Sequence, residues 1–281
     1  TVVMKTGSVV FGTVFSGITT ITTVTFDFAG TIPANSCQDI TNLTSVTIGN
    51  TVTSIGNLAF KGCTGITSLT LTPTSTLEEI GQEAFDGCTG LTGQLAIPDT
   101  VTTIGQSGFK STNISVFTFT SSSTLTTMGS ESFNNCSELT SFSIPETVTS
   151  VGTKTFYNCV KLTNFTFETT SQLLNISNEM FYGCNTLPTI VIPNSVTSIG
   201  NSAFEGTSLL TSLTIGNSVE TIGTYAFKSS NFTSIIIVGS ITSVGTGAFT
   251  GVPLTTVVMN NNNVVFGTVF SGITSITTVT F

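Results

Sequence analysis

The sequence contains no histidine, no tryptophan and only six basic residues, all of them lysine. Charged side chains make up 7% of the chain, against about 25% in an ordinary globular protein. Without histidine the chain cannot build a Ser–His or Cys–His nucleophile pair or an imidazole metal site. A net charge of −8 leaves no basic surface that could follow phosphates, which argues against nucleic acid as a partner. The apolar runs are also too short to span a bilayer.

Threonine, serine, asparagine and glycine take the place of the missing charges, and 22 phenylalanines join valine, isoleucine and leucine in the apolar part. This apolar content is too high for a disordered chain. Threonine, valine, isoleucine and phenylalanine favour strands over helices. The composition therefore predicts a mainly β fold without long regular helices.

One phrase, LTSLTIxxSVTSIGxxAFxGC, recurs along the chain and ends near a phenylalanine. Successive copies of that phenylalanine are 21 to 25 residues apart, at Phe60, Phe85, Phe109, Phe133, Phe156, Phe181, Phe204, Phe227, Phe249 and Phe270. Phe15 and Cys37 extend the register toward the N-terminus, with Cys37 in place of phenylalanine. We therefore predict about twelve coils of about 23 residues each.

Each copy contains two short strand patterns. Leu210–Ile215 alternates apolar and polar residues, which predicts a strand buried on one face. A turn and a second short strand pattern follow, and the preceding copy shows this pattern at 196–199, where two polar residues stand between Val196 and Ile199. The next segment of that copy, 200–204, predicts a tight turn that directs Phe204 inward. A unit of this size cannot enclose a core alone, but stacked units can.

The repeat therefore predicts a single continuous solenoid over residues 1–281. Its best-defined coils lie between residues 42 and 255, and the terminal coils, 1–41 and 256–281, are atypical. Because the chain starts with threonine and shows no leader pattern, we expect it to be a processed form or a segment of a longer array.

Three phrases resemble the BspA-like leucine-rich repeats: IGNTVTSIGNLAFKGC (48–63), LTSFSIPETVTSVGTKTFYNC (139–159) and IPNSVTSIGNSAFEG (192–206). The resemblance covers nearly the whole chain, although 35–37 and 267–270 lack the AFxGC closure. It implies a right-handed, curved solenoid with a parallel sheet on the concave side. It also implies a secreted or surface-displayed protein that acts in adhesion to matrix proteins and other cells, and it carries over no catalytic residue.

The acidic residues mostly stand singly in different copies, and only Glu78, Glu79 and Glu83 form a cluster. Carboxylates of this kind can hold a hard cation, but a solvated loop accounts for them equally simply. We therefore predict no enzyme activity, no metal site and no cofactor.

Five of the six cysteines stand three residues after the anchoring phenylalanine, at Cys63, Cys88, Cys136, Cys159 and Cys184. In a solenoid this spacing makes a column. Neighbouring coils are close enough for a disulfide, yet side chains stacked in register suit its torsion angle poorly. We expect thiols that serve as small buried hydrophobic groups, and neither the spacing nor the lack of histidine suggests zinc.

The polar positions of the first strand pattern are expected on the concave face as an uncharged hydroxyl surface. Threonine also suits any exposed strand position, but concave faces of leucine-rich repeats commonly hold partners. The candidate binding residues are Ser45, Thr47, Ser68, Thr70, Ser141, Ser143, Asn164, Thr166, Thr189, Ser212, Thr214 and Ser234.

Six Asn-x-Ser/Thr sequences would accept N-linked glycans if the source is eukaryotic. They begin at Asn42, Asn113, Asn135, Asn164, Asn175 and Asn231. A chain so rich in asparagine and threonine produces such sequences by chance, so they support secretion only weakly.

Two functions are compatible with these patterns. The first is an extracellular or cell-surface module that binds a protein or another cell-surface macromolecule. The second is a structural array that associates end to end, because no polar cap is visible at either terminus. Residues 1–26 and 256–281 are identical at 21 of 26 positions, which predicts a larger repeat of eleven coils that continues beyond the chain.

Overall fold

The computed structural model describes residues 1–5, 20–72, 74–239, 241–259, 270 and 273–280. This part of the chain is a β-solenoid of about eleven turns, and every regular element in it is a short strand. The chain divides into two compact units, Thr1–Leu139 and Thr140–Phe281. The mainly β repeat fold is confirmed, whereas the single continuous domain stays a prediction. Phe15 and most of the two repeated terminal segments lie outside the described residues.

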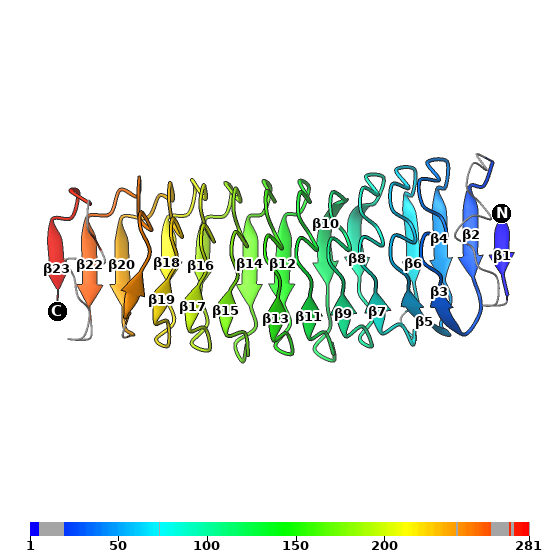
Figure 1. Cartoon of the computed structure of the whole chain (residues 1–281), viewed down its shortest axis with the longest axis horizontal. Coiled ribbons are helices and arrows are strands. Elements are labelled where there is room, and N and C mark those ends of the chain that lie inside the picture. The colour runs from blue at the N-terminus through cyan, green and yellow to red at the C-terminus, as the bar shows by residue number, and fades with distance from the viewer. Residues whose placement is uncertain (6–19, 73, 240, 260–269, 271–272, 281) are drawn as a thin grey trace. The chain divides into compact units, whose positions relative to one another are not determined.

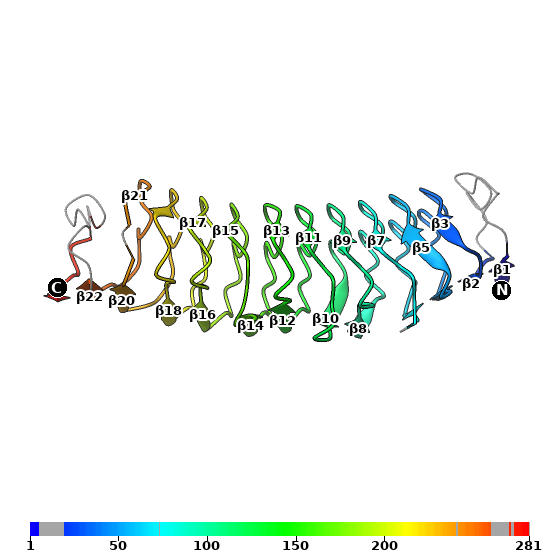
Figure 2. The same ribbon diagram turned by 90° about the horizontal axis from the view of Figure 1, so that it is seen from below.

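In the first unit, strands of successive coils pair in parallel along two sides of the coil (Figures 1 and 2). The strands on the side that carries the LTSLTI pattern are β1 (Val2–Met4), β2 (Thr23–Phe26), β4 (Ser45–Ile48), β6 (Ser68–Leu71), β8 (Thr92–Ala96) and β10 (Asn113–Thr118). The strands on the other side are β3 (Gly30–Ile32), β5 (Val52–Ile55), β7 (Glu79–Ile80), β9 (Thr103–Ile104) and β11 (Thr127–Met128).

The second unit repeats the arrangement. Its strands on the LTSLTI side are β12 (Ser141–Ile144), β14 (Asn164–Phe167), β16 (Thr189–Val191), β18 (Ser212–Thr214), β20 (Ser234–Ile237), β22 (Thr256–Met259) and β23 (Thr278–Thr280). Those on the other side are β13 (Ser150–Val151), β15 (Asn175–Ile176), β17 (Ser198–Ile199), β19 (Thr221–Ile222) and β21 (Ser243–Val244). We call the LTSLTI side the strand face.

Residues at equivalent positions of neighbouring coils pair with each other. In the second unit Ser198 pairs with Thr221 and Ile199 with Ile222, which confirms the spacing of about 23 residues. Because strand side chains alternate between two sides, Leu213 is buried while its neighbours Ser212 and Thr214 are exposed. Within each unit, the inward side chains of successive coils therefore stack into columns that form the core.

The anchoring phenylalanines form the main column, and their predicted inward direction is confirmed. Ring exposure is 0% for Phe60, Phe85, Phe109, Phe133, Phe156, Phe181, Phe204 and Phe227. Rings of neighbouring coils stack almost in parallel, with centroids 5.2 Å apart for Phe60 and Phe85 and 5.2 Å apart for Phe204 and Phe227. Offset stacking of this kind adds about 0.5–1.5 kcal/mol per pair beyond burial.

The turn around each phenylalanine has an unusual backbone that the repeat phrase does not announce. A residue with left-handed conformation precedes the phenylalanine by two positions and another follows it by two, as with Ser202 (φ 50°) and Gly206 (φ 79°) around Phe204. Such a conformation costs a non-glycine residue roughly 1–2 kcal/mol. Here the N–H groups of Ser202, Phe204 and Gly206 each donate to a carbonyl of the next coil, at 2.8, 2.7 and 2.8 Å, which offsets the strain.

Three coils have a longer connection after their strand on the strand face. Phe167 and Leu173 are six positions apart in the sequence, whereas the equivalent residues of the next coil, Ile192 and Val196, are four positions apart. Each long connection buries a serine whose hydroxyl accepts the N–H two residues later, at 2.9 Å for Ser75 and 3.4 Å for Ser123 and Ser171. These serines are 48 residues apart, which reveals a second period of two coils.

Candidate binding groove

The candidate binding residues all point away from the core. In the first unit Ser45 and Thr47 are half-buried, and Ser68 and Thr70 are exposed. In the second unit the half-buried members are Ser141 and Ser143, and the exposed members are Asn164, Thr166, Thr189, Ser212, Thr214 and Ser234. Neighbouring hydroxyls contact each other, because Thr166 donates to Ser143 at 3.0 Å.

The structure gathers four of these residues around one groove of about 760 Å³ in the second unit. Asn164 and Thr166 come from β14, Thr189 from β16 and Thr214 from β18. The groove therefore crosses three neighbouring strands on the strand face, and its size falls within the usual range of about 300–1,000 Å³ for ligand sites.

A proline accounts for the position of this groove. At the starts of β14, β18, β22 and β23, two successive N–H groups share one carbonyl of the preceding coil, as when Thr163 and Asn164 donate to Thr140 at 3.0 and 3.1 Å. At the start of β16 the first of these positions is Pro188, which has no N–H. Accordingly β14 and β16 belong to different sheets, and the surface opens between them.

The long connection 168–172 bounds the other end of the groove. It leaves Phe167 half-buried, whereas Ile192, at the same place in the next coil, is 1% exposed. Glu168 also lines the groove and accepts a hydrogen bond from Ser143 at 3.2 Å. On β16, the apolar Val191 is 61% exposed. The groove thus combines neutral hydrogen-bonding groups with exposed apolar surface.

Sequence reasoning missed Phe167 and Glu168 as parts of the site, whereas the strand pattern already gives Val191 an outward position beside Thr189. Two signals could have found them: the extra residues after Phe167 and the proline at position 188. The other predicted residues of the second unit, including Ser212 and Ser234, do not line this groove. In the first unit Ser68 lines a smaller cavity of about 200 Å³ between β6 and β8, which likewise belong to different sheets.

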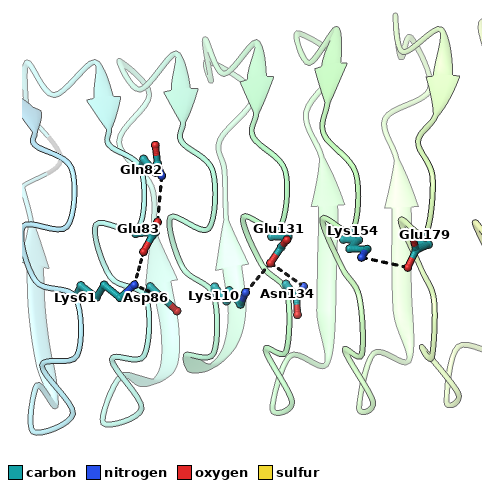
Figure 3. Close-up of polar contacts among 9 residues, drawn as sticks. All are labelled: Lys61, Gln82, Glu83, Asp86, Lys110, Glu131, Asn134, Lys154 and Glu179. Carbon is teal, nitrogen blue, oxygen red and sulfur yellow. Dashed lines mark hydrogen bonds and ion pairs between the residues drawn. The ribbon is translucent and has the colours of Figure 1, made fainter.

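Charged side chains gather instead at the phenylalanine turns. Figure 3 shows Lys61 reaching Glu83 and Asp86 of the next coil, with 3.2 Å between Lys61 Nζ and Asp86 Oδ2. The hydrogen bond from Lys61 lowers the pKa of Glu83. Lys110 pairs with Glu131 at 2.5 Å.

In the second unit, Lys154 pairs with Glu179 at 3.5 Å (Figure 3). Lys228 pairs with Glu205 at 2.8 Å. These pairs are partly exposed, so each contributes little stability. The residues that line the groove include no lysine.

The cysteines of the column are buried and free of disulfides in the structure. The thiols of Cys63, Cys88, Cys136 and Cys184 do more than fill space, because each of these four donates to a carbonyl of the preceding coil. Cys88 Sγ lies 3.0 Å from Phe60 O, and Cys184 Sγ lies 3.1 Å from Phe156 O. Burial raises the pKa of the Cys63 thiol to about 12 and that of Cys136 to about 11, so these thiols stay protonated at neutral pH.

Threonine or serine takes the cysteine position in other coils. Thr112, Thr207 and Ser230 are buried there. Ser230 donates to Phe204 O at 3.3 Å, and Thr112 lies 3.4 Å from Cys136 Sγ. In these coils a hydroxyl replaces the thiol as the buried hydrogen-bonding group, whereas the buried residue at the same position after Phe249 is the apolar Val252.

The six glycosylation sequences are distributed over both units. Asn42, Asn135, Asn164, Asn175 and Asn231 are exposed, and the half-buried Asn113 donates from its amide to Thr89 O at 2.8 Å. Because Asn164 lines the groove, a glycan attached there would occupy the site. Glycosylation stays a prediction.

Within the described residues, no group of three or more acidic or cysteine side chains is placed to hold a metal. The acidic cluster of the sequence is divided, because Glu83 turns to Lys61 while Glu79 is exposed on β7. The same part of the chain contains no helix long and apolar enough to cross a membrane.

Comparison with known families matches this repeat architecture. The sequence model of the BspA type leucine rich repeat region matches residues 30–76, 66–185 and 174–281. The chain belongs to the BspA-type leucine-rich repeat family. The resemblance noted from the sequence is thereby confirmed. No curated protein matches the chain.

Solved structures share the fold of this BspA-type chain. A leucine-rich repeat protein from Bacteroides ovatus ATCC 8483 is 22% identical with a TM-score of 0.62, over 91% of this chain and 64% of that one. A leucine-rich repeat protein from Eubacterium ventriosum ATCC 27560 is 21% identical with a TM-score of 0.54, over 90% and 88% of the two chains. The pneumococcal vaccine antigen PcpA is 19% identical with a TM-score of 0.52, over 94% of this chain and 78% of that one. The chain thus spans 64% of the length of the Bacteroides protein.

Proposed function

We propose that the chain is a non-enzymatic binding module, displayed at a cell surface or outside the cell, that acts in adhesion by holding a macromolecule on its strand face. The observation that carries this proposal is the groove across β14, β16 and β18. It presents a 61% exposed Val191 among uncharged hydrogen-bonding side chains. An exposed apolar residue in a concave site is typical of a binding surface.

Family membership supports the surface location and the absence of catalysis. Leucine-rich repeat proteins are generally non-catalytic, and PcpA, which shares the fold, is described as a vaccine antigen. A vaccine antigen must be accessible to antibodies, which suits a surface-displayed protein. Glu168 is the single ionisable side chain that lines the groove on the strand face of the second unit.

An adhesion assay tests the proposal. Beads coated with residues 1–281 are applied to plates coated with extracellular matrix proteins, to polysaccharide-coated plates and to intact cells, and attachment is counted. We expect attachment to at least one surface and its loss with Val191→Asp, because an exposed charge disrupts an apolar contact without disturbing the core.

The matched control is Ile236→Asp, which changes another exposed apolar strand-face residue (51%) outside the groove. Attachment no greater than that of uncoated beads on every surface would refute the proposal. Equal loss with both variants would show that the groove is not the binding site.

A further inference from the structure

We infer that the groove across β14, β16 and β18 binds a neutral carbohydrate chain. This inference rests on the proposed function and specifies the chemical class of the ligand. Four properties of the groove support it: its charge, its hydrogen-bonding groups, its apolar surface and its shape.

The charge of the groove excludes the anionic ligands that surface proteins often bind. Glu168 is the single ionisable side chain among the lining residues, which include no lysine. A sulfated or carboxylated polymer would therefore find no cation, and the net charge of −8 would repel it. A cationic ligand would find one carboxylate, which already accepts a hydrogen bond from Ser143.

The hydrogen-bonding groups match sugar hydroxyls. Thr166, Thr189 and Thr214 each present a hydroxyl, and Asn164 and Asn194 each present an amide. The Thr166 hydroxyl already donates to Ser143 and Asn194 Oδ1 already accepts from Asn217 N–H, which leaves the lone pairs of Thr166 and the amide N–H groups of Asn194 for a ligand. Hydroxyls and amides both donate and accept hydrogen bonds, as the hydroxyls of a neutral sugar do. Each sugar hydroxyl can thus be satisfied in both directions without an ion pair.

The apolar surface of the groove matches the C–H face of a sugar ring. Val191, which is 61% exposed, lies on the middle strand of the three. Phe167 and Pro193, both half-buried, also line the groove. A pyranose ring has one face of C–H groups and a rim of hydroxyls, so it can pack on these side chains while its hydroxyls bond to the threonines and asparagines.

The shape suits a chain rather than an isolated monosaccharide. A volume of about 760 Å³ exceeds what one sugar ring fills, and the lining residues come from three successive coils. The paired strands β16 and β18 lie about 4.8 Å apart, and Thr166 stands on β14 across the opening, so the three threonines offer hydroxyls one after another across the groove. A polymer with repeated hydroxyls can contact several of them at once.

Isothermal titration calorimetry on residues 1–281 produced in bacteria tests the inference. The probes are short gluco-, manno-, galacto- and xylo-oligosaccharides, with heparin and hyaluronan oligosaccharides and an extended-peptide library as the alternatives. We expect binding of at least one neutral oligosaccharide, with an affinity that changes less than about twofold between about 0.05 and 0.5 M salt, because no exposed ion pair is involved.

Variants locate the binding site. Val191→Asp should weaken binding at least about tenfold, and Thr189→Val, which removes one hydroxyl at constant shape, about fivefold. Ile236→Asp, outside the groove, should leave affinity unchanged. Unfolding curves of all three variants should match the parent chain, since all three sites are exposed.

Binding of only anionic oligosaccharides or only peptides would overturn the inference, as would equal losses with Val191→Asp and Ile236→Asp. If coated beads still attach to cells or matrix in a Val191-dependent manner while no neutral sugar binds, the carbohydrate inference fails and the proposed function stands. If the beads attach to nothing, the proposed function fails as well.

Discussion

The phenylalanine turn and the strand face of the same coils differ in how strictly they repeat. From Phe60 to Phe227 every anchoring ring is fully buried, and each is flanked by left-handed residues two positions away on both sides. On the strand face, by contrast, the ladder is interrupted between β6 and β8, between β14 and β16 and between β18 and β20.

The difference has a physical cause. The turns around Phe60, Phe85, Phe109, Phe156, Phe181, Phe204 and Phe227 each donate three backbone hydrogen bonds to the next coil, so a change in one of these turns would disturb its neighbour. An outward strand side chain contacts mainly solvent, and an extra loop residue costs little. Substitutions of the anchoring phenylalanines should therefore lower the free energy of unfolding strongly, and those on the strand face should change binding rather than stability.

The largest expected effect is the loss of a ring from the column. Phe204→Ala should lower the free energy of unfolding by about 3–5 kcal/mol, because the ring is fully buried and stacks on Phe181 and Phe227 at 5.1 and 5.2 Å. Urea denaturation followed by circular dichroism measures the change. Thr214→Ala on the strand face is the control, and it should cost no more than about 0.5 kcal/mol. Similar losses for both variants would contradict the contrast between the two regions.

The cysteine column should show the next largest effect. Cys88→Ala removes the hydrogen bond to Phe60 O and leaves space for the missing sulfur, so it should cost about 1–2 kcal/mol. Cys88→Ser keeps a donor and should cost less, as the natural threonine and serine residues of this column indicate. Urea denaturation of both variants measures this order. If alanine proves better tolerated than serine, the column needs only apolar volume.

Alkaline pH should weaken the column by a smaller amount. Burial raises the pKa of Cys136 from 9.0 to about 11, so the folded state favours the neutral thiol. The stability that folding gains from keeping this thiol neutral is complete below pH 9 and is lost as the pH rises toward 11. Over this interval the free energy of unfolding falls by up to about 1.4 kcal/mol per pH unit. Stability curves at pH 8 and pH 10 measure the loss, and Cys136→Ser should reduce it. A stability that is unchanged over this interval in the parent chain would show that the thiol is not shielded from solvent.

The smallest effect is expected at the ion pairs. The side chains of Lys110 and Glu131 are 30% and 28% exposed, so their coupling should be no more than about 1 kcal/mol and should decrease with salt. A double-mutant cycle with Lys110→Met and Glu131→Gln measures it. A coupling comparable to the loss in Phe204→Ala would mean that charge, not the ring column, holds the coils together.

Much of this fold could be predicted from the sequence, because a repeat displays its buried positions once per coil. The spacing of the phenylalanines, the alternation in Leu210–Ile215 and the neutral character of the outward positions all follow from side-chain identity. The candidate site could be predicted only in part. Asn164, Thr166, Thr189 and Thr214 were expected on one face, but nothing in their own pattern distinguishes them from Ser212 or Ser234.

By itself, the sequence determined the period, the inward columns, the family and the uncharged strand face, because these depend on which residue stands at each repeat position. The tertiary structure alone decided where the ladder opens, which residues adopt the left-handed conformation and what the thiols bond to. Each of these depends on two coils at once: on whether Pro188 can donate to the preceding coil, and on whether a carbonyl lies within reach of Ser202 or Cys88. A single repeat contains only one of the two partners.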